Sequence, residues 1–202
     1  MNTFERFAYQ QICQALAGIE PGIKPDIYVL SFFIDDFDGD PRRPTLQLGY
    51  NTTTRQAQCT PSDGQAPQWP IASDASEAKW NFAFWLQNVL VLVGDPETAG
   101  GQLWKDLLES KNLWYQDLDE DGPEEDFERA DELAERITAL FVESCVRIAQ
   151  SLHADGVIEQ QFSHAVPIVV HELEYYDQIA AQTRAANPPG LASEFEDWVA
   201  SM

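Results

Sequence analysis

A short block near the carboxyl end of the chain holds the residue types that most often carry out chemistry in proteins. An apolar run, Ile-Val-Val at residues 168–170, leads directly into His-Glu-Leu-Glu-Tyr-Tyr-Asp at residues 171–177. Polar side chains bunched where a buried strand ends often form the sites of α/β proteins. The candidate binding residues of this block are His171, Glu172, Glu174, Tyr175 and Asp177.

Several roles fit this block. His171 with Glu174 could act as a general acid–base pair, and His171 with His164 and a nearby Glu could bind a metal ion. The spacing requires neither, because Tyr175 stands where the zinc-protease pattern H-E-x-x-H has its second histidine. In a structural interpretation, Glu172 and Glu174 favour the positive amino end of a helix while the tyrosines pack. The block alone leaves catalysis, binding and scaffolding open.

Acidic stretches elsewhere suggest a different chemistry. Residues 117–128 match the calcium-loop template D-x-[DN]-x-[DN]-G-x₅-E in full, and hard carboxylate oxygens at this spacing can converge on Ca²⁺. An acidic run is, however, more often a solvated segment, and a second acidic cluster at residues 35–40 is interpreted as an Asp-rich turn. Calcium is the cofactor that the 117–128 stretch suggests, with Asp117, Asp119, Asp121 and Glu128 as its predicted ligands.

The net charge of the chain argues against some classes of binding partner. It has 12 basic and 34 acidic residues, which give a formal net charge of −22. This balance argues against nucleic acid, because phosphate contacts need Lys and Arg, and against anionic membrane surfaces. It favours solubility, cation binding or a basic protein partner. Free, widely spaced cysteines and an amino terminus without a signal-peptide pattern predict a cytoplasmic location.

The elements that must position these residues follow from hydrophobic periodicity. Residues 27–35 are almost continuously apolar, which predicts a central strand covered on both faces. Residues 45–52 alternate, which predicts a strand with one solvated face, and residues 89–93 fit either a strand or a helix end. Residues 55–74 indicate an irregular loop. Helical patterns occupy residues 3–19, with Thr3 as the cap, and residues 77–87, 103–111, 127–152, 173–186 and 191–202.

Together these patterns predict an α+β fold, with a small mixed sheet of three to five strands covered by several helices. Residues 166–170 supply a further strand of this sheet. We expect a single domain over residues 1–202, with an acidic loop at about residues 115–126 and helices within residues 173–202 docked on the core.

Parts of the chain also resemble an uncharacterised bacterial family of domains of unknown function. The block at residues 171–177 is the marker of that family, and the resemblance extends over most of the chain. By analogy, families of this kind include cytoplasmic immunity proteins that neutralise bacterial toxins, which implies binding without catalysis. The segments that carry the resemblance are residues 27–34, 78–87, 114–115, 140–143, 167–177, 186–190 and 194–195.

The sequence therefore favours an acidic cytoplasmic binding protein, of the immunity type, that neutralises a basic partner. Two alternatives stay open. One is a metal-dependent enzyme that uses His171, Glu172, Glu174 and Asp177. The other is calcium binding through residues 117–128.

Overall fold

The computed structural model describes residues 1–61, 70–117 and 123–202. Four strands form its centre: β1 (Ile27–Asp36), β2 (Pro44–Thr52), β3 (Val91–Val93) and β4 (Ile168–His171). They lie in the order β3-β2-β1-β4 within one sheet. The β1–β2 and β2–β3 pairs are antiparallel, whereas β1 and β4 run parallel. A mixed sheet packed against helices confirms the predicted α+β fold class.

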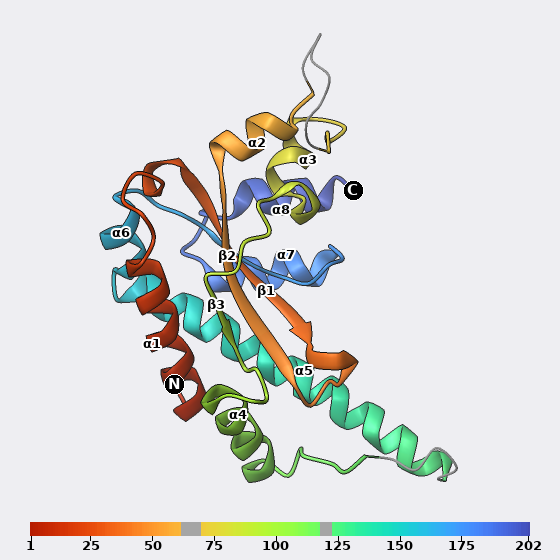
Figure 1. The fold of residues 1–202 in the computed structure, drawn as a ribbon. Helices are drawn as coiled ribbons and strands as arrows, with labels where there is room; N and C mark the ends of the chain where they lie inside the picture. Colours follow the sequence, from red (N-terminus) through yellow and green to blue (C-terminus); the bar gives the residue numbers. More distant parts are fainter. Residues whose placement is uncertain (62–69, 118–122) are drawn as a thin grey trace.

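Helices cover both faces of this sheet (Figure 1). Because side chains alternate along a strand, Leu30 and Phe32 of β1 face one core, and Val29 faces the other. The first core is the larger, and it contains residues from α1 (Thr3–Ala17), α4 (Ala99–Ser110), α5 (Glu124–Ala154) and α6 (Val157–Phe162). The second contains residues from α3 (Ala75–Trp80), α7 (Asp177–Ala186) and α8 (Ser193–Ala200). β1 is therefore buried on both sides, as its apolar run predicts.

The prediction of a solvated face on β2 is wrong. Asn51, on the expected polar side, is fully buried. Its amide donates to the Tyr28 hydroxyl at 2.9 Å and accepts from the Leu86 amide at 3.3 Å. Nearby, a Cβ on Gly49 would lie 2.5 Å from the Asn88 carbonyl oxygen. The segment at residues 86–88 therefore crosses this face of β2, bonds Asn51 and packs closely on Gly49.

That crossing segment also departs from the helix predicted over residues 77–87. The α3 helix ends at Trp80, and a single 3₁₀ turn (Phe82–Phe84) follows. The Lys79 carbonyl accepts hydrogen bonds from the Tyr28 hydroxyl at 2.5 Å and from the Trp85 indole at 2.8 Å. Packing of large aromatic side chains therefore overrides helix periodicity here.

Other predicted boundaries also change. A helix, α2 (Thr53–Cys59), whose amino end is capped by the Thr52 hydroxyl, extends into the expected loop at residues 55–74, of which residues 62–69 lie outside the described residues. Residues 91–93 form a strand instead of a helix end. Asn2, and not Thr3, caps α1 through a capping box with Glu5. The helix predicted from residue 173 begins at Asp177.

Side chains of α7 and of Asn187, the residue that follows it, cover the open edge of β4. The Ile168 amide donates to Asn187 Oδ1 at 2.8 Å, and Asn187 Nδ2 donates to the Ile168 carbonyl at 2.7 Å. Further along, Thr183 Oγ1 accepts from the Val170 amide at 3.1 Å, and Gln182 Nε2 donates to the Val170 carbonyl at 2.9 Å. An edge strand needs such cover because its unpaired backbone groups invite foreign strands.

Among the described ranges, no helix has both the length and the apolar character needed to cross a bilayer. The longest helix, α5, is amphipathic, and Figure 1 shows its amino-terminal part extending beyond the sheet. Its exposed surface there is strongly acidic, and its first turn contains Glu124, Glu125 and Asp126, which suit the positive end of the helix dipole.

Candidate functional site

His171, the central residue of the predicted site, is a buried core residue. It ends β4 with no exposed surface, and its Nδ1 donates to the Glu172 carbonyl oxygen at 2.9 Å. Its Nε2 lies 2.8 Å from the Ser31 hydroxyl, which acts as the donor in this tautomer. Burial lowers the pKa of His171 to about 4, so the imidazole is neutral at physiological pH.

Aromatic rings enclose this imidazole. Tyr175 stacks on it at an interplanar angle of 13° with the ring centroids 5.7 Å apart. Its hydroxyl oxygen accepts a hydrogen bond from the Phe82 amide at 3.1 Å. The packing role considered for the tyrosines therefore holds for Tyr175. The other rings whose centroids lie within 6 Å of the imidazole are Phe33, Phe82 and Trp85.

The acidic residues of the block do not converge on His171. Glu172 contributes its carbonyl oxygen to the imidazole, and its carboxylate lines a surface cleft together with Glu174. Asp177 is exposed at the start of α7. His164 bonds the Ile27 carbonyl at 2.9 Å, at the opposite end of the β1–β4 pair from His171. The two histidines therefore do not share a site.

Residues of the 172–177 block instead form one wall of a surface cleft. The cleft has a volume of about 500 Å³ and lies between the end of β1 and the segment that follows β4. Because β1 and β4 are parallel, with Phe33 opposite His171, the chain leaves both strands at the same edge of the sheet. This topology brings the turn at residues 35–40 beside the 172–177 block. The polar and exposed residues of its lining include Asp35, Asp36, Thr138, Glu172, Leu173, Glu174 and Tyr176.

The carboxylates that line this acidic cleft repel one another when they are ionised. Burial raises the pKa of Glu172, and the Asp36 carboxylate raises it further. Burial, with the charges of Asp35 and Asp40, also raises the pKa of Asp36. None of the acids that line the cleft forms a salt bridge with a described residue. A bound cation would relieve this repulsion.

Neutralising Asp36 should therefore stabilise the free protein. A raised pKa in the folded state means that the carboxyl group stabilises the fold when protonated and loses that contribution as the pH rises through its folded pKa. We expect Asp36→Asn to raise the free energy of unfolding near pH 7 by about 0.5 kcal/mol, an effect reduced by solvent screening. The gain should vanish at a pH below the ordinary Asp pKa.

Urea unfolding at both pH values measures this gain. Asp131→Asn, on the exposed surface of α5, is the matched control because it removes the same charge outside the cleft. If Asp131→Asn raises the free energy of unfolding as much as Asp36→Asn does, the effect comes from general charge reduction and not from the cleft.

Residues 118–122 of the predicted calcium loop at residues 117–128 lie outside the described residues. Asp119 and Asp121 lie there, so the calcium prediction stays a prediction. Asp117 forms an ion pair with Arg42, and Glu128 is exposed on α5. Within the described ranges, no three His, Cys, Asp or Glu residues are grouped so that they could hold a metal ion. The turn interpretation of residues 35–40 agrees with Asp40, whose Oδ1 accepts the Arg42 amide at 3.0 Å.

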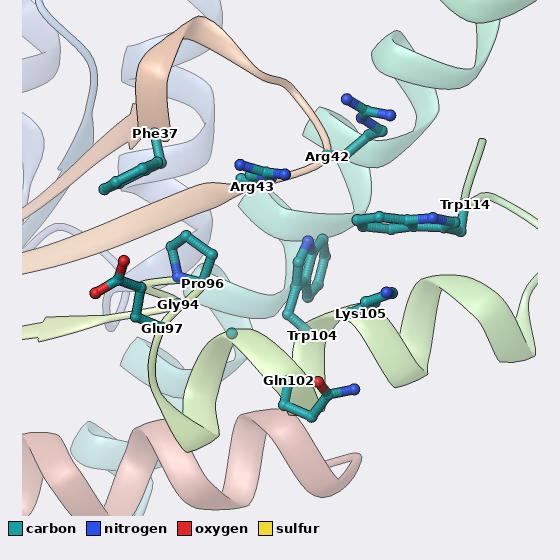
Figure 2. Close-up of a pocket in the computed structure, with 11 residues that line it drawn as sticks. Phe37, Arg42, Arg43, Gly94, Pro96, Glu97, Gln102, Trp104, Lys105 and Trp114 are labelled. Atoms are coloured by element: carbon teal, nitrogen blue, oxygen red, sulfur yellow. The ribbon is translucent and has the colours of Figure 1, made fainter. Parts of the chain in front are cut away.

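A second hollow contains residues that sequence reasoning missed. Figure 2 shows Arg42, Arg43 and Lys105 around two tryptophans, Trp104 and Trp114. The available signal was the adjacent Arg42-Arg43 pair, which is unusual in a chain with 12 basic residues. Its proximity to residues 94–114 depends on long-range packing that no local pattern indicates.

Comparison of the chain with known protein families, with characterised proteins and with solved structures finds no match.

Proposed function

We propose that this protein binds a basic segment of a partner protein through its acidic cleft. The observation that carries the proposal is the set of four carboxylates, Asp35, Asp36, Glu172 and Glu174, lining one hollow without a basic neighbour among the described lining residues. Cationic side chains would enter a site that already has the complementary charge.

Exposed apolar side chains support a protein partner over a free cation. Leu173, on the cleft wall, is 73% exposed, and Tyr176 beside it is 44% exposed. Large apolar side chains next to charged groups are typical of interfaces, where a few anchors provide most of the binding energy. A segment that combines Arg or Lys with an apolar residue would satisfy both parts of the cleft.

The net charge of −22 supports the same class of partner. A strongly negative protein attracts a cationic surface from a distance and accelerates the encounter. The cleft would then provide the specific contacts. A protein acting in this way would neutralise its partner by covering a basic surface, which is the immunity-type role expected from the sequence.

A titration with a defined probe tests the proposal. The probe is a short synthetic peptide of arginine and leucine, and its control replaces every arginine with neutral citrulline. At an ionic strength of about 0.15 M, where exposed long-range attraction is screened, we expect saturable binding of the arginine peptide in calorimetry. The citrulline peptide should bind at least about tenfold more weakly, a loss of about 1.4 kcal/mol.

Matched double variants separate the cleft from general charge. Asp36→Asn with Glu172→Gln removes two of the four negative charges of the cleft, whereas Asp131→Asn with Glu135→Gln makes the same charge change on exposed α5. The first pair should weaken peptide binding at least about tenfold and the second less than about twofold. Equal losses in both pairs, or no saturable binding by the parent protein, would contradict the proposal.

A further inference from the structure

We infer that the hollow between the β1–β2 turn and α4 binds a small organic oxyanion, a carboxylate or phosphate monoester carried on a flat apolar ring. The hollow has a volume of about 290 Å³, which suits a small molecule at the lower end of ligand-pocket sizes. It shares no lining residue with the acidic cleft. This anion pocket is therefore a separate site from that of the proposed function.

Three basic side chains line the anion pocket, although the chain as a whole is strongly acidic. Arg42 is already held, with Nη2 at 2.8 Å from Asp40 Oδ2 and a second ion pair to Asp117. Arg43 and Lys105 are held loosely, at 3.3 Å from Asp40 and 3.9 Å from Glu109, and both side chains are 42% exposed. Exposed pairs of this kind are weak, so neither ion pair prevents these cations from contacting a ligand.

A buried hydrogen-bond donor points into the same space. Trp104 is 1% exposed, and within the described part of the chain its indole Nε1 has no acceptor. Figure 2 shows the nitrogen end of its ring directed toward the space between Arg43 and Trp114. Buried donors nearly always have a partner, and a ligand oxygen would provide one. The Trp80 indole is also unpaired, but it packs in the second core and lines none of the hollows described above.

The walls of the anion pocket suit a flat ring and are fixed in place. The Trp114 ring is half-buried, and Lys105 Nζ lies 4.8 Å from its centroid. Gly94 has a φ of +96°, and a Cβ on Gly101 would lie 2.3 Å from the Asp95 carbonyl oxygen. These glycines let the turn at residues 94–96 press directly onto α4. The carboxylate of Glu97 points away from the cations in Figure 2.

Indole NMR provides the test on the intact protein. We expect benzoate or phenyl phosphate to shift the Trp104 indole N–H resonance saturably, and neutral benzamide to leave it unchanged. Loss of the peak in Trp104→Phe assigns it. If that variant does not fold, cross-relaxation with the rings of Phe4 and Phe141, whose centroids lie 5.1 and 4.9 Å away, gives the assignment.

Charge variants then locate the binding. Arg43→Gln and Lys105→Gln should each weaken binding of the anion at least about tenfold. Arg129→Gln, an exposed position on α5 outside the pocket, should leave it unchanged. The inference is overturned if neither anion shifts the Trp104 resonance, if benzamide shifts it equally, or if Arg129→Gln weakens binding as much as Arg43→Gln.

Discussion

Acidification from about pH 7 to about pH 4 is expected to cost the protein about 3 kcal/mol of unfolding free energy through His171 alone. The ordinary pKa of histidine is 6.5, and burial lowers that of His171 to about 4. The unfolded chain therefore takes up a proton over a pH range in which the folded protein does not. By linkage, the folded state loses stability as the pH falls through that range.

Denaturant unfolding across this pH range, on the parent protein and on His171→Gln, measures the contribution. The variant will have a different stability at neutral pH, because the aromatic rings around residue 171 must repack. The informative quantity is the difference between the two pH slopes, since other titrating groups contribute equally to both. Identical slopes, or an NMR titration of the His171 imidazole with a pKa near 6.5, would show that the residue is not the buried neutral group described.

Asn187→Ala is expected to lower the free energy of unfolding by about 3 kcal/mol. The side chain pairs with both backbone groups of Ile168, and Nδ2 also donates to the Thr183 carbonyl oxygen at 2.7 Å. Its removal leaves an edge-strand donor and acceptor unpaired in a partly buried position, where each costs about 1–3 kcal/mol.

Asn187→Asp is the control for this change, because it keeps the volume and the Oδ1 acceptor but loses both donated bonds. Near pH 7 its new carboxylate oxygen would face the carbonyl oxygens of Ile168 and Thr183, so it should destabilise the protein at least as much as Asn187→Ala in denaturant unfolding. Hydrogen exchange of the Ile168 amide should accelerate in Asn187→Ala. A loss below about 1 kcal/mol would mean that water replaces the asparagine readily and that α7 does not hold the edge of β4.

Local patterns predicted the parts of the fold that local forces determine. The continuous apolar run of β1 and the regular face of α5 each bury what their periodicity indicates. The predictions are wrong where segments that are distant in the sequence contact one another. Residues 81–87 leave the helix because Trp85 and Tyr28 bond the Lys79 carbonyl, and Asn51 is buried because that same segment covers β2.

The candidate site, too, could be predicted only as far as local patterns determine it. The sequence identified the 171–177 block and the acidic turn at residues 35–40 as separate features, and it placed residues 166–170 in the sheet. Which strand would pair with β4 was not readable from any local pattern. Parallel pairing with β1 brings the two acidic segments together and turns His171 inward toward Ser31. The acidic cleft therefore depends on topology more than on motif.

We propose that the acidic cleft, and not the acidic surface of α5, binds a basic partner. Backbone amide chemical shifts, recorded while the arginine–leucine peptide is added at about 0.15 M ionic strength, test it most directly. We predict that the largest changes will occur at residues 34–36, 138, 172–174 and 176, which line the cleft. Largest changes at residues 124–132 of α5, or uniform small changes over the acidic surface, would contradict it.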